Sequence, residues 1–269
     1  MEEPVIELHG IRKSYGKKEV LKGIDLSIGK GELFGLIGRN GAGKTTIFKI
    51  ILGLSDYKDG ELRIGREGES IEEGRKRIGF FIGLNFFPYL DARGNLEYYR
   101  TLKNIPDRGE VDRVLKVIGL DTEKGKFSTF SLGMKQRLGI GNALLGNPEI
   151  LILDEPVNGL DPQGIADVRH LVQTLNHDYG MTVIISSHIL GELQHTAHRF
   201  GIVNNGVIAK VVTQEDLMAA DRTVRLRVDD LPRAKKALQD AGVPILEETQ
   251  EAGSLEEYYF HLLEETDHA

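Results

Sequence analysis

One short segment of the sequence limits the fold and the chemistry more than any other. Residues 38–45 read Gly-Arg-Asn-Gly-Ala-Gly-Lys-Thr and match the pattern G-x-x-x-x-G-K-[ST]. An apolar run at 33–37 precedes the segment, and apolar residues recur at helical spacing over 45–54. The segment therefore predicts a phosphate-binding loop between a strand and a helix. A glycine-rich turn alone would not explain why Lys44 and Thr45 occur together.

The residue types in this loop suit the binding of a nucleotide. Glycines let backbone N–H groups come close to phosphate oxygens, and the start of a helix adds positive potential. We expect Lys44 to reach the β- and γ-phosphates and the hydroxyl of Thr45 to bind Mg²⁺. The predicted nucleotide-binding residues of this segment are Gly38, Arg39, Asn40, Gly41, Ala42, Gly43, Lys44, Thr45 and Thr46.

A second motif places two adjacent carboxylates at the end of an apolar run. Residues 150–155 read Ile-Leu-Ile-Leu-Asp-Glu. Ligands of open α/β sheets bind at the carboxyl ends of strands. We therefore expect Asp154 to hold Mg²⁺ through its water shell and Glu155 to act as a general base on an attacking water. The alternative is that one or both acids cap a helix.

Strand-like runs alternate with helix-like segments through most of the chain, which predicts an α/β fold with a mostly parallel sheet. The runs at 150–153 and 183–185 are typical of buried parallel strands. The Asn-Asn-Gly sequence at 204–206 predicts a tight hairpin turn. Near the N-terminus, the apolar residues of 5–8 and 21–28 predict an antiparallel β layer beside the main sheet.

Composition excludes several classes of protein. The chain of 269 residues has no cysteine, so disulfides, thiolate nucleophiles and cysteine-bound metals are excluded. Its formal net charge of −7 argues against nucleic acid as a partner. The N-terminus does not resemble a signal peptide, and the apolar runs are far shorter than the roughly 20 residues that cross a bilayer. We expect any contact with a membrane to be made through a partner.

A third segment, residues 130–137, reads Phe-Ser-Leu-Gly-Met-Lys-Gln-Arg. Ser131 is expected at a helix N-cap, with the N–H of Gly133 exposed in the first turn. A hydroxyl and a helix dipole would then face an anion, although an ordinary cap is the alternative. With its phosphate-binding loop and carboxylate pair, the chain resembles the ATP-binding subunits of ABC transporters. This segment is similar to the signature segment of that family. Leu132 stands where the family usually has glycine.

The resemblance implies roles for further residues. It implies that the signature segment binds the γ-phosphate of ATP held by the opposite protomer, through Ser131, Leu132, Gly133, Met134 and Lys135. Tyr15 is similar to the aromatic residue that stacks on adenine, with simple packing as the alternative. Asp161 is similar to the aspartate that couples the two sites across the dimer, and it is also a predicted N-cap. His188 is similar to the histidine that contacts the γ-phosphate, so the implied catalytic residues are Glu155, His188 and Lys44.

One position departs from the family pattern. Gly83 stands where the family usually has glutamine or sometimes glutamate. Glycine has no side chain to ligate Mg²⁺ or to position the attacking water, and Asn85 is a substitute only if the loop is rearranged. The sequence therefore predicts ATP binding and leaves the rate of hydrolysis open.

Aromatic residues are concentrated just before and just beyond this position. In the family this region contacts the membrane subunit, and aromatic side chains are enriched in interface cores. We expect some of them to dock a partner and others to form the core of the helical subdomain. The set consists of Phe80, Phe81, Phe86, Phe87, Tyr89, Tyr98 and Tyr99.

The resemblance also implies a domain plan. We expect an ABC-type ATP-binding domain with a P-loop NTPase core over residues 1–215, with a helical subdomain at about 84–146. Residues 216–269 are expected to form a small C-terminal α+β accessory region. Its predicted strands are at 224–228 and 243–246, and its predicted helix is at 234–241.

These features imply a subunit that dimerises around two ATP molecules, with itself or with a homologous subunit. It would hydrolyse ATP with Mg²⁺ and power a separate integral membrane permease from the cytoplasmic face of the cell membrane. The sequence is most similar to bacterial exporter subunits of the bacitracin-resistance and lantibiotic-immunity type, which implies an antimicrobial peptide, a drug or a similar compound as cargo. The alternative is a slow-cycling ATP-dependent clamp or regulatory module outside transport, and Gly83 is its best support.

Overall fold

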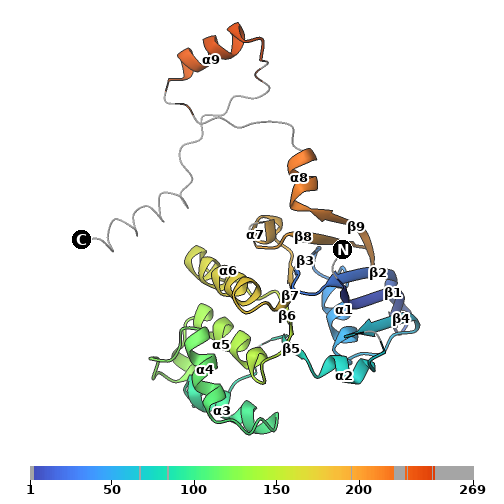
Figure 1. The fold of residues 1–269 in the computed structure, drawn as a ribbon, viewed down its shortest axis with the longest axis vertical. Helices are drawn as coiled ribbons and strands as arrows, with labels where there is room; N and C mark the ends of the chain where they lie inside the picture. The colour runs from blue at the N-terminus through green and yellow to red at the C-terminus, as the bar shows by residue number, and fades with distance from the viewer. Residues whose placement is uncertain are drawn as a thin grey trace. The chain divides into compact units, whose positions relative to one another are not determined.

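The structure is a computed structural model that describes residues 3–66, 68–83, 85–194, 196–220, 228, 230–243 and 245. The chain divides into two compact units, Met1–Met218 and Ala219–Ala269. The first unit contains two sheets and most of the helices (Figure 1). Within the described ranges, no helix combines the length and the apolar character that crossing a membrane would require.

The smaller sheet forms the predicted antiparallel layer. Alternating burial along β1 (Pro4–Tyr15) and β2 (Lys18–Gly29) places one face of each strand in a core. The two strands pair antiparallel, and β4 (Asp59–Ile64) adds a third strand on the other side of β1. The sequence analysis identified β1 and β2 but not β4.

The larger sheet has six strands in the order β5-β6-β7-β3-β8-β9. It is parallel from β5 to β8, and only the last strand runs antiparallel. Left-handed Asn205 and Gly206 make the predicted hairpin turn between β8 and β9. These observations confirm the α/β fold class. The strands are β3 (Leu33–Ile37), β5 (Ile78–Phe81), β6 (Ile150–Asp154), β7 (Thr182–Ser187), β8 (Arg199–Asn204) and β9 (Val207–Thr213).

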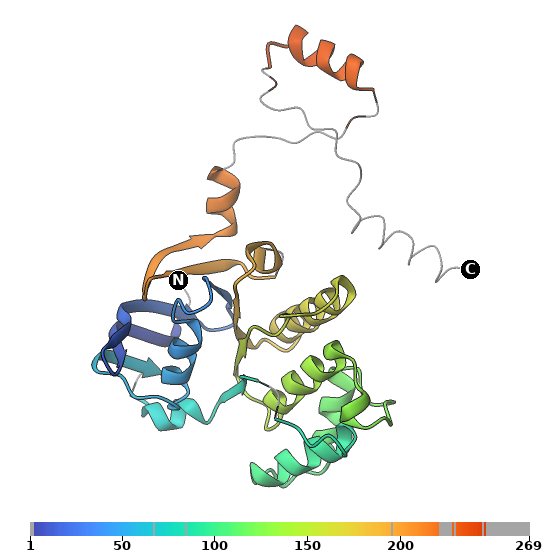
Figure 2. The ribbon, with the colours of Figure 1, turned by 180° about the vertical axis from the view of Figure 1, so that it is seen from behind.

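Helix α1 (Lys44–Ile51) lies between the two sheets, as both views show (Figures 1 and 2). Its buried isoleucines belong to a core that also contains apolar residues of β1, β2 and β6. The prediction that this helix continues to residue 54 is wrong. Gly53 takes a left-handed conformation, and the N–H of Leu54 bonds back to the carbonyl of Lys49, which ends the helix.

Helices cover the other face of the larger sheet (Figure 2). They include the segment predicted as the helical subdomain, in which Val111, Val114, Leu115 and Ile118 share the expected buried face. The elements on this side are α3 (Ala92–Leu102), α4 (Gly109–Val117), η1 (Phe127–Thr129), α5 (Leu132–Leu144) and α6 (Pro162–His177). Shorter helices are α2 (Ile71–Arg75), α7 (Leu190–Gln194) and α8 (Gln214–Ala220).

The C-terminal unit contains α9 (Leu231–Asp240), which falls on the helix predicted at 234–241. Asp230 caps it by accepting a hydrogen bond from the N–H of Arg233. The strands predicted at 224–228 and 243–246 lie mostly outside the described residues.

The parallel topology determines where functional side chains meet. Since β3, β5, β6 and β7 run in the same direction, the segments that follow them leave the sheet at one edge. We call this the carboxyl edge. The phosphate-binding loop follows β3, the carboxylate pair ends β6, His188 follows β7 and Gly83 follows β5.

Candidate functional site

The phosphate-binding loop, residues 38–45, connects β3 to α1 at the carboxyl edge. Gly43 occupies the N-cap position of α1 with a φ of 116°, and no side chain caps the first turn. A Cβ at Gly43 would come within 2.7 Å of Leu21 Cδ2. Only glycine is therefore compatible with this turn, and it leaves the first N–H groups of the helix without a side-chain acceptor. Such a helix start is suited to bind a phosphate.

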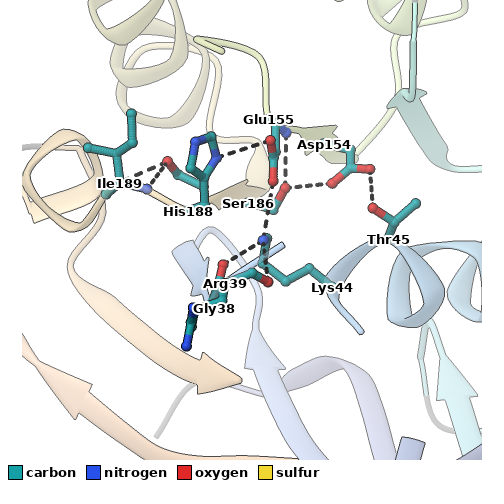
Figure 3. Close-up of polar contacts among 10 residues, drawn as sticks. Gly38, Arg39, Lys44, Thr45, Asp154, Glu155, Ser186, His188 and Ile189 are labelled. Atoms are coloured by element: carbon teal, nitrogen blue, oxygen red, sulfur yellow. Dashed lines mark hydrogen bonds and ion pairs between the residues drawn. The ribbon is translucent and has the colours of Figure 1, made fainter. Parts of the chain in front are cut away.

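Lys44 lies over its own loop, with its side chain almost completely buried. Its Nζ donates a hydrogen bond to the carbonyl of Gly38 at 2.6 Å and lies 3.2 Å from Glu155 Oε1 (Figure 3). A buried ammonium needs such partners because desolvation of a charge is costly. The cation is thus held between the loop and the carboxylate pair.

The two carboxylates at the end of β6 face different partners. Asp154 Oδ2 accepts a hydrogen bond from Thr45 Oγ1 at 2.7 Å, which links the strand to the start of α1. Glu155 lies between two cationic or potentially cationic groups, because its other oxygen, Oε2, is 3.1 Å from His188 Nδ1. The structure therefore brings Lys44, Thr45, Asp154, Glu155 and His188 into one group (Figure 3).

This group includes one side chain to which the sequence analysis assigned no role. Ser186, the next-to-last residue of β7, donates to Asp154 Oδ1 at 2.6 Å and accepts from the N–H of Glu155 at 2.9 Å. It was missed because its position beside Asp154 depends on β7 being the neighbour of β6 in the sheet. We refer to Lys44, Thr45, Asp154, Glu155, Ser186 and His188 together as the edge cluster.

Tyr15 lies at the end of β1 with 49% of its surface exposed. Its hydroxyl is 3.4 Å from Ser55 Oγ, and hydrogen bonds to Ser55 and then to Thr46 help lower the pKa of the phenol. Lys13 Nζ lies 4.9 Å from the centre of the ring. The ring is thus close to the first turn of α1 and accessible to a ligand, which suits stacking better than simple packing.

The signature segment is not part of the edge cluster. Ser131 is the N-cap of α5 and accepts a hydrogen bond from the N–H of Met134 at 3.2 Å. Asp161 is the N-cap of α6 and accepts from the N–H of Gly164 at 2.9 Å. Both predicted caps are therefore present. The two helix starts are neighbours, because a Cβ on Gly133 would lie 3.9 Å from the Cα of Gly164.

Gly83 is exposed and has a φ of 77°. A Cβ at this position would meet nothing within 4 Å. Asn85, named above as its substitute, is also exposed and accepts a hydrogen bond through its backbone carbonyl from the hydroxyl of Tyr99. The described residues therefore leave room at the usual glutamine position without filling it.

The aromatic residues of β5 and of the segment that follows it divide into two groups. Phe81 is buried in the core, and the half-buried side chain of Phe86 packs against this core. The rings of Phe87 and Tyr98 meet edge to face at 4.6 Å, and Tyr89 lies beside Phe87. Tyr89 and Tyr98 are 64% and 46% exposed. Some of these rings therefore lie in the core, whereas Tyr89 and Tyr98 remain exposed.

Known proteins provide an independent comparison. The family model described as ABC transporter matches residues 21–158. The bacitracin transport ATP-binding protein BcrA of Enterococcus faecalis is 39% identical over 244 residues, which cover 89% of this chain and 79% of that protein. The lantibiotic transport ATP-binding protein SrtF of Streptococcus pyogenes is 39% identical over 207 residues, 76% of this chain and 89% of that protein.

A solved structure provides a comparison of the fold. It is the dimeric, post-hydrolysis state of the ATP-binding cassette MJ0796 bound to ADP and Pi. It superimposes with a TM-score of 0.67 at 26% identity and covers 78% of this chain and 98% of its own. The similarity thus extends over most of both molecules.

Proposed function

The chain belongs to the ABC transporter family and is one of its ATP-binding and ATP-hydrolysing subunits, and we propose that it powers a membrane permease that exports peptide antibiotics or similar compounds. The main support for ATP hydrolysis is the edge cluster, in which a lysine, a histidine and two carboxylates meet beside a phosphate-binding loop. The cargo is suggested by the relatives, whose names refer to bacitracin and to lantibiotic transport.

Binding of ATP begins with the phosphate-binding loop. The uncapped N–H groups at the start of α1 donate to phosphate oxygens. Lys44 exchanges its bond with Gly38 for the β- and γ-phosphates, and the ring of Tyr15 stacks on the adenine. Thr45 and Asp154 fit a magnesium site, because a hydroxyl and a carboxylate oxygen lie 2.7 Å apart beside that loop. Mg²⁺, when bound, neutralises charge on the phosphates.

Hydrolysis needs a base for the attacking water, and Glu155 is placed for this role. The carboxylate accepts a proton as the water oxygen attacks the γ-phosphorus, and the bond to the bridging oxygen breaks with its electron pair leaving on ADP. His188, which already pairs with Glu155, holds this carboxylate and can donate to the γ-phosphate. Proximity of these groups supplies much of the catalysis.

The signature segment completes the site from a second protomer. Ser131 and the N–H of Gly133 lie at an exposed helix start, apart from the edge cluster of their own chain. They bind the γ-phosphate of ATP held by the partner, and Asp161 links the two sites. ATP thereby holds the dimer together, and loss of the γ-phosphate lets it open. A nucleotide can drive this opening and closing only if ATP binds the closed dimer more tightly than the open one.

The exposed rings of Tyr89 and Tyr98, together with the half-buried ring of Phe87, form the docking surface for the permease. Aromatic side chains with exposed faces supply large contact areas at interface cores. Through this contact the subunit lies at the cytoplasmic face of the membrane. The partners are thus a second copy or a homologous subunit, and an integral membrane permease.

Gly83 favours a second candidate, a slow ATP-dependent clamp. Apart from its neighbours in the chain, the described residues place no heavy atom within 4 Å of a Cβ at Gly83, so they offer no side chain at this point to assist the attacking water. A slow clamp would bind ATP tightly and hydrolyse it rarely, and it would not accompany a permease.

The test measures Mg²⁺-dependent ATP hydrolysis against protein concentration, for the natural chain and for Gly83→Gln. A rate per subunit that rises with concentration in the natural chain supports a dimeric transport ATPase. No hydrolysis despite tight ATP binding, with activity restored by Gly83→Gln, supports the clamp. Co-purification with a membrane protein, rather than with ribosomes or DNA, tests the proposed partner.

A further inference from the structure

Ser186 lies at the centre of the edge cluster, and the chemistry described above does not use it. The residue is completely buried. Its hydroxyl donates a hydrogen bond to Asp154 Oδ1 at 2.6 Å and accepts one from the N–H of Glu155 at 2.9 Å. A serine hydroxyl has one proton to donate and can accept in addition. A single side chain of β7 therefore holds two consecutive residues at the end of β6.

The backbone of Glu155 needs such a contact. Its φ is 50°, in the left-handed region that a residue with a side chain seldom adopts. A strained conformation of this kind costs on the order of 1–3 kcal/mol and persists only when its surroundings enforce it. The bond from the Glu155 N–H to Ser186 is one such constraint. The strained turn aims the Glu155 carboxylate at Lys44 and His188.

The bond to Asp154 fixes the rotation of the other carboxylate. Ser186 holds Oδ1, which leaves Oδ2 facing Thr45 Oγ1 at 2.7 Å. Without Ser186 the Asp154 carboxylate would lose one of its two side-chain partners and could turn about its Cβ–Cγ bond. The hydroxyl thus sets the direction of both carboxylates through one atom.

We infer that Ser186 is a positioning residue that holds the Asp154–Glu155 turn in its reactive geometry. It acts through these two residues and does not touch the nucleotide. The inference rests on the proposed role of Glu155 as the base. Removal of a residue that orients a ligating side chain typically lowers activity by about 10- to 100-fold.

The experiment compares Ser186→Ala with a control on the same strand. Thr182, at the other end of β7, is also buried, and its hydroxyl accepts a hydrogen bond from the N–H of Gly31 at 2.8 Å. Thr182→Val therefore removes a comparable buried hydroxyl away from the edge cluster. We expect Ser186→Ala to lower kcat by about 10- to 100-fold with little change in KM for ATP. Thr182→Val should retain the natural kcat, and Ser186→Thr, which keeps a hydroxyl, should recover most of it.

A double variant tests whether Ser186 acts through Glu155. In a Glu155→Gln background, Ser186→Ala should slow single-turnover hydrolysis by much less than it does in the natural chain, because residues that act as a unit are not additive. An equal further slowing would overturn the inference. So would a kcat for Ser186→Ala that matches that of Thr182→Val.

Amide hydrogen exchange separates failure of this inference from failure of the proposed function. Ser186→Ala should speed exchange in the segment 154–158 without nucleotide, whereas Thr182→Val should leave that segment unchanged. If the natural chain does not hydrolyse ATP, the proposed function fails and the exchange result still decides whether Ser186 holds the turn. Unchanged exchange in Ser186→Ala would overturn the inference in either case.

Discussion

Replacing Glu155 by glutamine separates the two roles that the edge cluster gives this residue. The variant keeps the shape of the side chain. It also keeps the backbone N–H of residue 155, which donates a hydrogen bond to Ser186 Oγ. It removes the charge that lies 3.2 Å from Lys44 Nζ and 3.1 Å from His188 Nδ1. The variant therefore loses both the base and the competition for Lys44, and the first loss affects hydrolysis whereas the second affects ATP binding.

The magnitudes follow from the chemistry and the distances. Loss of a general base lowers kcat by about 10²- to 10⁴-fold, which corresponds to roughly 2.7–5.4 kcal/mol of activation free energy. At an effective dielectric constant of about 20, unit charges 3.2 Å apart attract by about 5 kcal/mol before desolvation is counted. ATP must replace this attraction when its phosphates take over Lys44. We therefore expect Glu155→Gln to bind ATP at least as tightly as the natural chain.

Two assays test this prediction: single-turnover hydrolysis of ATP with Mg²⁺, and equilibrium binding of a fluorescent ATP analogue. Glu149→Gln is the matched control, because Glu149 directly precedes β6 at the end away from the edge cluster. It should leave both kcat and the Kd for ATP unchanged. Undiminished hydrolysis by Glu155→Gln would remove Glu155 from the mechanism, and a clearly raised Kd would refute the competition for Lys44.

Three further predictions concern capping, stacking and pH. Asp161→Ala should lower the free energy of unfolding by about 1 kcal/mol through loss of the α6 cap, whereas Asp161→Asn should retain the natural stability. Denaturant titration measures the stability of both variants, and equal losses would contradict the capping role. Tyr15→Ala should raise the Kd for ATP by about 5- to 150-fold, because stacking of a base on an aromatic ring contributes about 1–3 kcal/mol, while Tyr15→Phe should leave it unchanged; an unchanged Kd in both would exclude stacking. Bonds from Arg113 and then from the N–H of Gly146 help lower the pKa of the Glu110 carboxyl. This group therefore stabilises the fold above its unfolded pKa, and the advantage of the natural chain over Glu110→Gln should shrink as pH falls through the lowered folded pKa; a constant difference in acid-titration unfolding would contradict it.

Much of the fold could be predicted because local signals agreed with the final topology. The pattern around residues 33–45 requires a strand, a loop and a helix in that order, and the structure has them. Ser131 and Asp161 are predictable caps because their hydrogen bonds join residues three apart in the chain. The end of α1 was missed because the sequence analysis followed the apolar spacing and overlooked Gly53 as a helix stop.

The remainder depends on contacts between distant segments. The third strand of the antiparallel sheet, β4, pairs with β1 across about fifty residues of sequence, and only its last four residues alternate between polar and apolar side chains. Ser186 meets Asp154 only because β6 and β7 are neighbours in register. Strand order of this kind is decided by the packing of the whole sheet, which no single segment encodes.

Sharing of each ATP site between two protomers can be tested by complementation between two inactive variants. Lys44→Ala disables a phosphate-binding loop but keeps the signature, whereas Ser131→Ala does the reverse. Each variant alone should be inactive. In an equal mixture, half of the dimers should contain one protomer of each variant. Each such dimer holds one intact site of two, so the mixture should regain about a quarter of the natural rate. A mixture as inactive as its components would contradict a shared site.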